Sequence, residues 1–189
     1  MLGEFGTIQY IINRWNKSLK SLYNYNIRFK YILILFMPSK EKINFLVREI
    51  EEEDLQNGFL QTLSNLTELG KIYNDIIKSK KILQEIKTHP FYKIFVAVKD
   101  EGLIIGTTTI LIEQKFIHDG GRVGHIEDVA TRNEYEGLGV GSALIRTCLD
   151  FAKKKNCYKV ILDCSEKNIP FYKKIGFKEH DVSMRYDIT

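Results

Sequence analysis

The chain is 189 residues long, 44% of its residues are hydrophobic, and its formal net charge is +4. This length suits one domain, and the hydrophobic fraction can supply its core. The mild positive charge is compatible with anionic small molecules. The sequence lacks the basic stripe interleaved with aromatic residues that is typical of nucleic-acid-binding proteins.

Three cysteines, Cys148, Cys157 and Cys164, bear on metal and redox chemistry. Their number is odd and none belongs to a Cys-x-x-Cys pair, which disfavours both a disulfide framework and a zinc site. We therefore predict buried free thiols, no metal, and a protein of the reducing cytoplasm.

Residues 1–42 differ in composition from the rest and end near an apolar run, residues 31–38. That run is far shorter than the roughly 20 residues that span a bilayer. It also lies far from the start, where a signal peptide would have its apolar region. We predict a poorly ordered or loosely docked extension, with an uncleaved targeting segment as the alternative, and a single domain over residues 43–189.

A strand and two helices are predicted at the start of the domain. Residues 45–50 favour a strand, and Asp54 can cap a helix that Gly70 ends. A second helical pattern covers residues 73–87. The apolar periodicity places on the buried faces Leu55, Phe59, Leu63 and Leu66 in the first helix and Ile76, Ile77, Leu83 and Ile86 in the second.

Strands dominate the remainder, and they predict a mixed α/β domain. The expected elements are strands at residues 94–98, 103–112, 125–130, 158–163 and 182–186, a long helix that follows the third of these, and a short helix at residues 168–175.

The stretch from His125 to Lys155 carries the strongest functional signal. A short extended run is followed by Glu136-Gly137-Leu138-Gly139-Val140-Gly141, which enters a helix with a regular apolar stripe. Glycines let a ligand approach the backbone closely, and the unpaired N–H groups of a helix start face an anion. The stretch therefore predicts a pyrophosphate cradle.

Two other interpretations of this turn compete with the cradle. The turn could be only a tight connection between a strand and a helix. A dinucleotide-binding fingerprint would need Gly-x-Gly-x-x-Gly and an acidic residue about 20 positions later, for which Asp163 is a candidate. Here the spacing is Gly-x-Gly-x-Gly, and too few residues follow for a doubly wound fold, so the fingerprint is disfavoured.

The same turn resembles the acetyl-CoA site of the Gcn5-related N-acetyltransferase (GNAT) superfamily, whose signature is Gln/Arg-x-x-Gly-x-Gly/Ala. Within the superfamily the resemblance is to the glucosamine 6-phosphate N-acetyltransferase family, and it runs from about Val47 to Met184. Three blocks carry it, namely residues 112–118, residues 124–130 and residues 156–177.

The resemblance implies a GNAT fold, with a mixed central sheet flanked by helices. It implies direct acetyl transfer from acetyl-CoA to the amine of glucosamine 6-phosphate in a ternary complex, without a metal. It also implies a cytoplasmic homodimer whose sugar-phosphate site is built partly from the neighbouring subunit's C-terminal segment.

Cofactor and catalytic roles follow from the resemblance residue by residue. A bulge in the central strand turns the N–H group of Val129 toward the thioester carbonyl, and Tyr172 donates a proton to the thiolate; by packing statistics alone, Tyr172 on a short helix would be a core residue. Asp163 and Glu127 bind or orient the acceptor amine. The acetyl-CoA contacts implied are Val129, Ala130, Thr131, Gly137, Leu138, Gly139, Val140, Gly141, Ser142, Asn168 and Tyr172.

The acceptor site implied by the resemblance gathers carboxylates for the amine and cations or N–H donors for the phosphate. Taken singly, each of these residues could be an ordinary surface residue. The set is Thr67, Lys115, Phe116, Ile117, His118, Glu127, Asp128, Tyr158, Lys159, Asp163 and Arg185.

Two positions depart from the family pattern. Glu136 replaces the usual Gln or Arg, and we expect its carboxylate to point to solvent or to pair with a cation such as Arg132. Asp187 stands where the family generally has an arginine, and Arg185, on the same face of an extended strand, can substitute for it.

Two other functions stay open on the sequence. The chain could be a GNAT acetyltransferase that acts on a protein or polyamine amine, which an open acidic groove without a phosphate site would favour. It could also be a non-catalytic module that binds acetyl-CoA without turnover.

Overall fold

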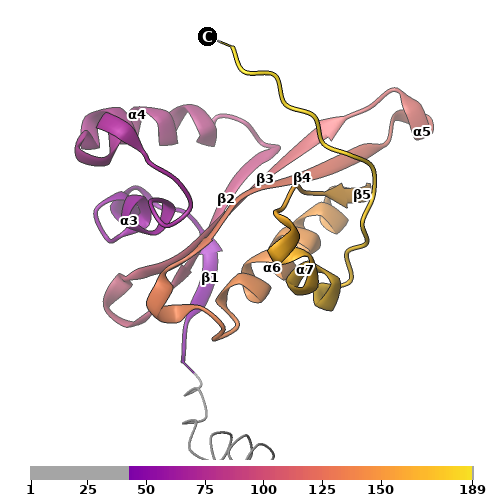
Figure 1. Cartoon of the computed structure of the whole chain (residues 1–189). Helices are drawn as coiled ribbons and strands as arrows, with labels where there is room; N and C mark the ends of the chain where they lie inside the picture. Colours follow the sequence, from indigo (N-terminus) through magenta and orange to yellow (C-terminus); the bar gives the residue numbers. More distant parts are fainter. Residues whose placement is uncertain (1–42, 189) are drawn as a thin grey trace, which may run out of the picture. The chain divides into compact units, whose positions relative to one another are not determined.

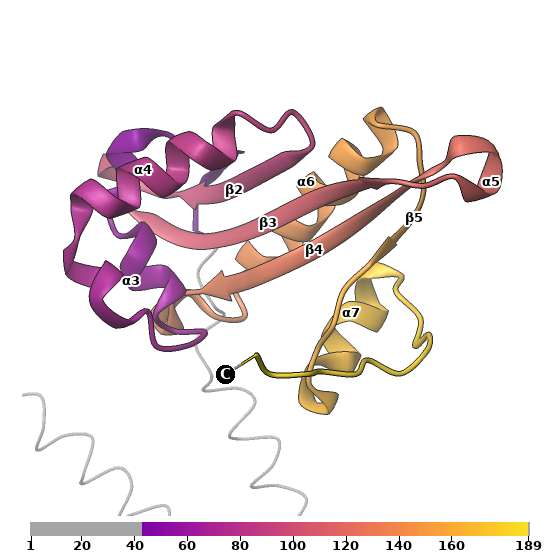
Figure 2. The same ribbon diagram turned by 90° about the horizontal axis from the view of Figure 1, so that it is seen from above.

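The computed structural model describes residues 43–188, which form one sheet with helices on both faces (Figures 1 and 2). The extension predicted for residues 1–42 lies outside the described residues. Within residues 43–188, every helix is too short or too polar to cross a lipid bilayer.

Five strands make the sheet, and their order in space, β1-β2-β3-β4-β5, is their order in the chain. Neighbouring strands from β1 to β4 are antiparallel, whereas β5 lies parallel to β4. The mixed sheet predicted from the sequence is therefore confirmed. Its strands are β1 (Leu46–Glu49), β2 (Tyr92–Val98), β3 (Ile104–Gln114), β4 (Arg122–Thr131) and β5 (Cys157–Ile161).

Helices lie against both faces of the sheet. In Figure 1, α3 and α4 lie on one side of the sheet and α6 on the other. The helices are α3 (Phe59–Leu63), α4 (Ile76–Lys87), α5 (Ile117–Gly120), α6 (Val140–Lys154) and α7 (Ile169–Ile175). Short 3-10 turns connect them, namely η2 (Glu52–Leu55), η3 (Gly70–Asn74), η4 (Asp100–Gly102), η5 (Asn133–Tyr135) and η6 (Glu166–Asn168).

The core is divided between the two faces by the alternation of side chains along the strands. In β2, Ile94 and Val96 join the apolar cluster beneath α3 and α4, while Phe95 and Ala97 join the cluster beneath α6. Both clusters are buried, so β2 is apolar from Ile94 to Val98 rather than alternating with polar residues.

Close contact between α6 and the sheet depends on Gly106 of β3. A Cβ atom at this position would lie 2.5 Å from Cγ1 of Val140, 2.9 Å from Cδ1 of Leu144 and 3.3 Å from the carbonyl oxygen of Ala130. The absence of a side chain at Gly106 therefore sets how near the first turn of α6 approaches the central strands.

The helix predicted after Asp54 is wrong as one continuous element. Gly58 adopts a left-handed conformation with φ of 100° and separates η2 from α3. Asp54 is buried inside η2, where its carboxylate accepts hydrogen bonds from the Glu51 N–H group at 2.7 Å and from both Arg48 Nη atoms at 2.6 and 2.8 Å. Leu66, predicted to be buried, is half exposed, and Gly70 begins η3 rather than ending a helix.

The second helix starts three residues later than predicted, because Asp75 caps it by accepting a hydrogen bond from the Lys78 N–H group at 2.9 Å. Leu83 is buried as predicted, but Ile77 is 80% exposed. The prediction for Ile77 was wrong because α4 is covered along one narrow stripe only. Among the cysteines, Cys148 is buried as predicted, and burial raises the pKa of its thiol to about 12, whereas Cys164 is exposed.

The strand predicted at residues 182–186 is absent from the structure. Residues 182–188 have no regular secondary structure, and Val182, Met184 and Tyr186 are 88–93% exposed. Their alternation of apolar and polar residues suits a strand, but a strand also needs the backbone of a neighbour. Within the described chain, this segment has none.

Gly106→Ala should lower the free energy of unfolding by about 1–3 kcal/mol, the usual cost of overpacking a core, because the new methyl group meets Val140. Urea denaturation measures the loss. Val140→Ala supplies the matched background: it removes the nearest clashing carbon, so Gly106→Ala should cost less there than in the native chain. An equal cost in both backgrounds would contradict this account.

Candidate active site

A cavity opens where β4 and β5 separate. The two strands pair only from Arg122 and Cys157 up to His125 and Ile161, and Figure 2 shows them diverging beyond that point. The space between them, with a volume of about 600 Å³, is called here the splay cavity. It is lined by Asn65, Leu66, Ile126, Glu127, Asp128, Val129, Ala130, Thr131, Glu136, Leu162, Asp163, Cys164, Ser165, Lys167, Asn168 and Tyr172.

A bulge lies in β4 at the mouth of this divergence. Thr109 pairs with Glu127 and Thr107 with Ala130, so Asp128 and Val129 together face Thr108. Asp128 takes a left-handed conformation with φ of 51°, which is uncommon for a residue other than glycine. The bulge expected in the central strand is therefore present, and it bends the backbone of β4 where the strand lines the cavity.

The glycine-rich turn between β4 and α6 has the open shape that an anion needs. Gly137 and Gly139 have φ of 72° and 90°, and Gly139 is the N-cap of the 15-residue α6. A Cβ atom at Gly139 would meet nothing within 4 Å, whereas one at Gly141 would lie 3.3 Å from Cζ of Phe171. Open space in front of free helical N–H groups fits a pyrophosphate. This turn can hold the diphosphate of acetyl-CoA.

The remaining residues predicted around the turn are placed unequally. Val140 is buried, so only its backbone can contact a ligand, while Leu138 and Ser142 are partly exposed. Glu136 is exposed at the edge of the splay cavity. Arg132, the cation suggested for it, donates from Nη2 to Oε1 of Gln61.

Three carboxylates gather at the splay cavity, as the sequence predicted for an amine acceptor. Partial burial, followed by the charges of Asp128 and Asp163, raises the pKa of Glu127, and His125 opposes the shift. Asp163 accepts a hydrogen bond at 3.1 Å from the Ser183 hydroxyl. Three anionic groups in one place can attract an ammonium group and then share its proton.

Tyr172 lies between the splay cavity and a second cavity beside β5. Only 8% of the residue is exposed, and its ring packs edge-on against Phe171 and Phe177 at centroid distances of 4.9 and 5.9 Å. Burial first, and then Cys164, raises the pKa of the Tyr172 phenol. The hydroxyl therefore keeps its proton throughout the neutral range, as a proton donor requires, while its ring is also a packing group.

The residues predicted to bind the acceptor phosphate lie mainly on and near the α5 hairpin, away from the residues that line the splay cavity. The His118 and Tyr158 rings stack at 4.3 Å, and Lys159 lies 5.9 Å above the Tyr158 ring. Nζ of Lys115 is 2.5 Å from Oε1 of Glu113. Phe116 is fully exposed at the tip, and Ile117 beside it is 61% exposed.

Two further predicted phosphate ligands are not brought to this cluster. Thr67 is exposed and follows Leu66, which lines the splay cavity. Arg185 pairs with Asp187, its Nε lying 2.6 Å from the carboxylate. Of the cations predicted for the phosphate, only Lys159 shares a cavity with one of the predicted carboxylates, Asp163, and that is the cavity described next.

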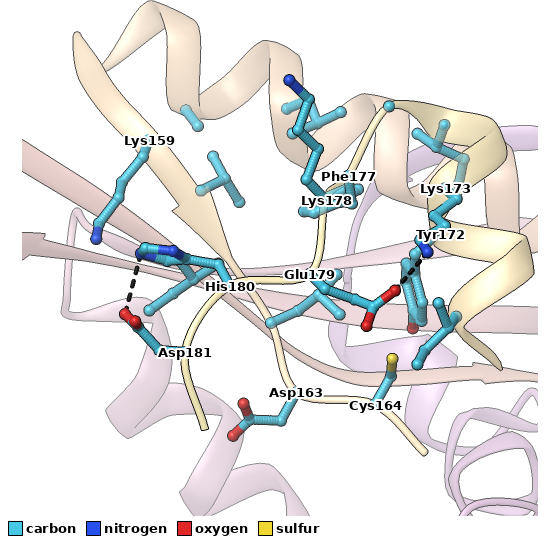
Figure 3. Close-up of a pocket in the computed structure, with 18 of the residues that line it drawn as sticks. Lys159, Asp163, Cys164, Tyr172, Lys173, Phe177, Lys178, Glu179, His180 and Asp181 are labelled. Carbon is cyan, nitrogen blue, oxygen red and sulfur yellow. Dashed lines mark ion pairs between the residues drawn. The ribbon is translucent and has the colours of Figure 1, made fainter. Parts of the chain in front are cut away.

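A larger cavity of about 860 Å³, called here the edge cavity, lies along the outer edge of β5 (Figure 3). Lys159, Tyr172 and Phe177 line it together with the chain that follows α7. Lys173 of α7 pairs with Glu179 of that chain, and the neighbouring residues His180 and Asp181 lie 3.0 Å apart. Because β5 has no strand partner on this side in residues 43–188, its outer backbone groups face the edge cavity.

Several lining residues of the splay cavity were missed by sequence reasoning. Asn65 and Leu66 come from the turn after α3, and Leu162, Cys164 and Ser165 from the end of β5. The proximity of Cys164 to Asp163 at a strand end was the one available signal. Among residues 43–188, no group of three or more His, Cys, Asp and Glu side chains has the arrangement of a metal site.

Comparison with known proteins agrees with this architecture. Residues 47–177 match the acetyltransferase (GNAT) family. The chain belongs to this family, whose enzymes use acetyl-CoA as the acetyl donor.

Within this family, the chain is similar to enzymes named glucosamine 6-phosphate N-acetyltransferase. The glucosamine 6-phosphate N-acetyltransferase of Trypanosoma brucei brucei is 36% identical over 153 residues, which cover 77% of this chain and 97% of that protein. The enzyme of the same name from Candida albicans is 34% identical over 145 residues, or 74% and 93% of the two chains. The crystal structure of glucosamine-6-phosphate N-acetyltransferase from Arabidopsis thaliana is similar with a TM-score of 0.72 at 32% identity, covering 77% and 99%.

Gly139→Val should weaken the affinity for acetyl-CoA at least tenfold, because a branched side chain would fill the cradle. Isothermal titration calorimetry measures the affinity. Gly70→Val is the matched control, since Gly70 also has a positive φ and open space but lies outside the cradle. The control should share the backbone strain and keep the affinity. Equal affinity in the native protein and Gly139→Val would remove the cradle from the site.

Proposed function

We propose that this chain transfers the acetyl group of acetyl-CoA to the amine of glucosamine 6-phosphate, giving N-acetylglucosamine 6-phosphate for UDP-N-acetylglucosamine biosynthesis. The observation that carries the proposal is the splay cavity, where three carboxylates gather along the end of β4 that leads into the glycine-rich turn. The relatives named glucosamine 6-phosphate N-acetyltransferase support the choice of acceptor, since their likeness spans nearly their whole length.

The residues at the cavity can carry each step of acetyl transfer. Glu127, Asp128 and Asp163 bind the acceptor ammonium and take its proton, so that the amine lone pair can attack the thioester carbon. The N–H group of Val129, turned by the bulge, stabilises the oxyanion. When the carbon–sulfur bond breaks, the buried Tyr172 hydroxyl protonates the departing thiolate.

Free-thiol release from acetyl-CoA tests the proposal directly. Glucosamine 6-phosphate should support turnover, whereas unphosphorylated glucosamine should do so far less well because it lacks the phosphate contacts. Faster release with a polyamine or a lysine peptide would favour an acetyltransferase with a different acceptor. Binding of acetyl-CoA without thiol release in the presence of any of these amines would favour a non-catalytic module.

Tyr172→Phe should slow the chemical step about a hundredfold, the low end for general acid catalysis, because a thiolate is already a good leaving group. Affinity for acetyl-CoA should hardly change, since the ring keeps its packing against Phe171 and Phe177. Single-turnover kinetics isolates the chemical step. An unchanged rate there would leave Tyr172 a packing residue only.

A homodimer is part of the proposal, because most of the phosphate-binding candidates lie away from the splay cavity of their own chain. The α5 hairpin carries the phosphate-binding candidates, but none of Lys115, His118 and Tyr158 lines the splay cavity. The C-terminal segment exposes alternate apolar residues, and β5 has a free edge within residues 43–188. A second copy that adds its C-terminal segment to a strand edge would cover both features and complete the site.

Arg185→Ala should raise the Michaelis constant for glucosamine 6-phosphate about tenfold, since a hydrogen bond to a charged group contributes about 1.5–3 kcal/mol. The constant for acetyl-CoA should stay nearly unchanged. Steady-state kinetics with each substrate varied in turn gives both constants.

Asp187→Ala is the matched control for Arg185. It frees Arg185 from the carboxylate that it now contacts, so the constant for glucosamine 6-phosphate should fall. Equal losses for both substrates in Arg185→Ala would instead indicate a defect in folding or assembly, which sedimentation analysis would detect. No loss for either would assign the phosphate to the lysines.

A further inference from the structure

The turn after α3 is attached to the end of β4 by one side chain. Nδ2 of Asn65 donates to the carbonyl oxygen of Thr131 and to Oδ1 of Asn133, both at 3.3 Å. These groups are 66 and 68 residues away in sequence. A second link, from Arg132 to Gln61, joins the same two segments one turn earlier in α3. The contact is therefore a built connection between two elements.

Asn65 occupies the wall of the splay cavity at which the two proposed substrates would meet. Asn65, Leu66, Thr131 and Glu136 all line this cavity, and the bond from Asn65 to Thr131 joins the two segments that supply them. Thr131 is among the residues proposed for acetyl-CoA, and Thr67, two residues after Asn65, is among those proposed for the sugar phosphate. Asn65 thus joins the cofactor side of the cavity to the acceptor side.

The core fixes α3 but not the turn that follows it. Thr62 is fully buried, and its hydroxyl oxygen lies 2.9 Å from the carbonyl oxygens of Gly58 and Ile104, so that its one proton can be donated to either and α3 is fastened to the sheet. Residues 64–68 are all exposed. Their backbone bonds, such as Leu66 N–H to the Leu63 carbonyl at 2.9 Å, return only to α3. The side chain of Asn65 therefore holds this turn directly against the end of β4.

We propose that Asn65 is a positioning residue that couples the binding of the two substrates, an inference that rests on the proposed function. Occupation of the cofactor side orders Thr131, Thr131 holds Asn65, and Asn65 places Thr67 for the acceptor. Coupling of this kind is reciprocal, so each substrate strengthens the binding of the other by the same factor. One uncharged side-chain hydrogen bond of ordinary strength corresponds to a factor of about three to ten.

Calorimetry of glucosamine 6-phosphate binding, with and without saturating coenzyme A, tests the proposal on the native chain and on Asn65→Ala. In the native chain, coenzyme A should tighten sugar-phosphate binding about three- to tenfold. In Asn65→Ala the two affinities should agree within about twofold. The variant should fold normally, because Asn65 is exposed.

Two further variants separate coupling from a general effect of mutation. Ser64→Ala removes a side-chain bond to the Gln61 carbonyl at 2.8 Å in the same turn without touching β4, and it should keep the coupling. Asn133→Ala removes one of the two acceptors of Asn65; it should reduce the coupling and add nothing in the Asn65→Ala background. Thermal stability alone would not distinguish these variants, whereas the coupling factor does.

Each result of these titrations supports or contradicts the positioning role of Asn65. Coupling that persists in Asn65→Ala, or that is absent from a native chain able to bind both ligands, overturns this inference and leaves the proposed function intact. A native chain that binds coenzyme A but shows no binding of glucosamine 6-phosphate overturns the proposed function and this inference with it. Loss of coupling in Asn65→Ala but not in Ser64→Ala supports the positioning role.

Discussion

The divergence of β4 from β5 is the constraint on which the rest of the site depends. Two parallel strands normally continue side by side as long as their backbones can pair. Here the pairing stops at His125 and Ile161, and the bulge at Asp128 and Val129 bends β4 just beyond. Backbone and carboxyl groups that a regular sheet would have buried are left facing a cavity. The sheet thereby lacks some backbone hydrogen bonds between β4 and β5, and the candidate binding site lies in their place.

The second requirement is that the helix carrying the cradle stay close to this opening. Gly106 allows α6 to approach β3, and Val140 and Leu144 fill the space directly above it. Gly139 then places the first N–H groups of α6 beside the end of β4. The anion-binding turn and the carboxylate cluster are thus held by one packed unit.

Local sequence patterns predicted those parts of the fold whose cause is local. The apolar stripe of α6 is buried because helical spacing alone places its members on one face, namely Leu144, Cys148 and Ala152. The break at Gly58 was not predicted, since one glycine inside an apolar pattern is often tolerated in a helix. The strand at residues 182–186 failed for a different reason, because its alternation says nothing about whether a neighbour is present.

The residues of the candidate site also differ in whether a local sequence pattern could predict them. The glycine-rich turn, the bulge and Asp163 belong to contiguous segments and could be identified from motifs, whereas Asn65, Leu66 and Cys164 reach the cavity only through the tertiary arrangement. The separation of the α5 hairpin from the splay cavity could not be read from the chain either. It depends on where the ribbon of β3 and β4 ends relative to α7, which is a property of the whole sheet.

The order of the strands also has a consequence for how the chain folds. β2, β3 and β4 are joined by short connections and pair with their sequence neighbours, so this meander closes small loops and can form early. β5 can dock only after α6 has crossed over the sheet, because a parallel strand requires such a crossover. The cavity exists only between β4 and β5, and we therefore expect binding competence to appear in the last step of folding, after most of the sheet is already native.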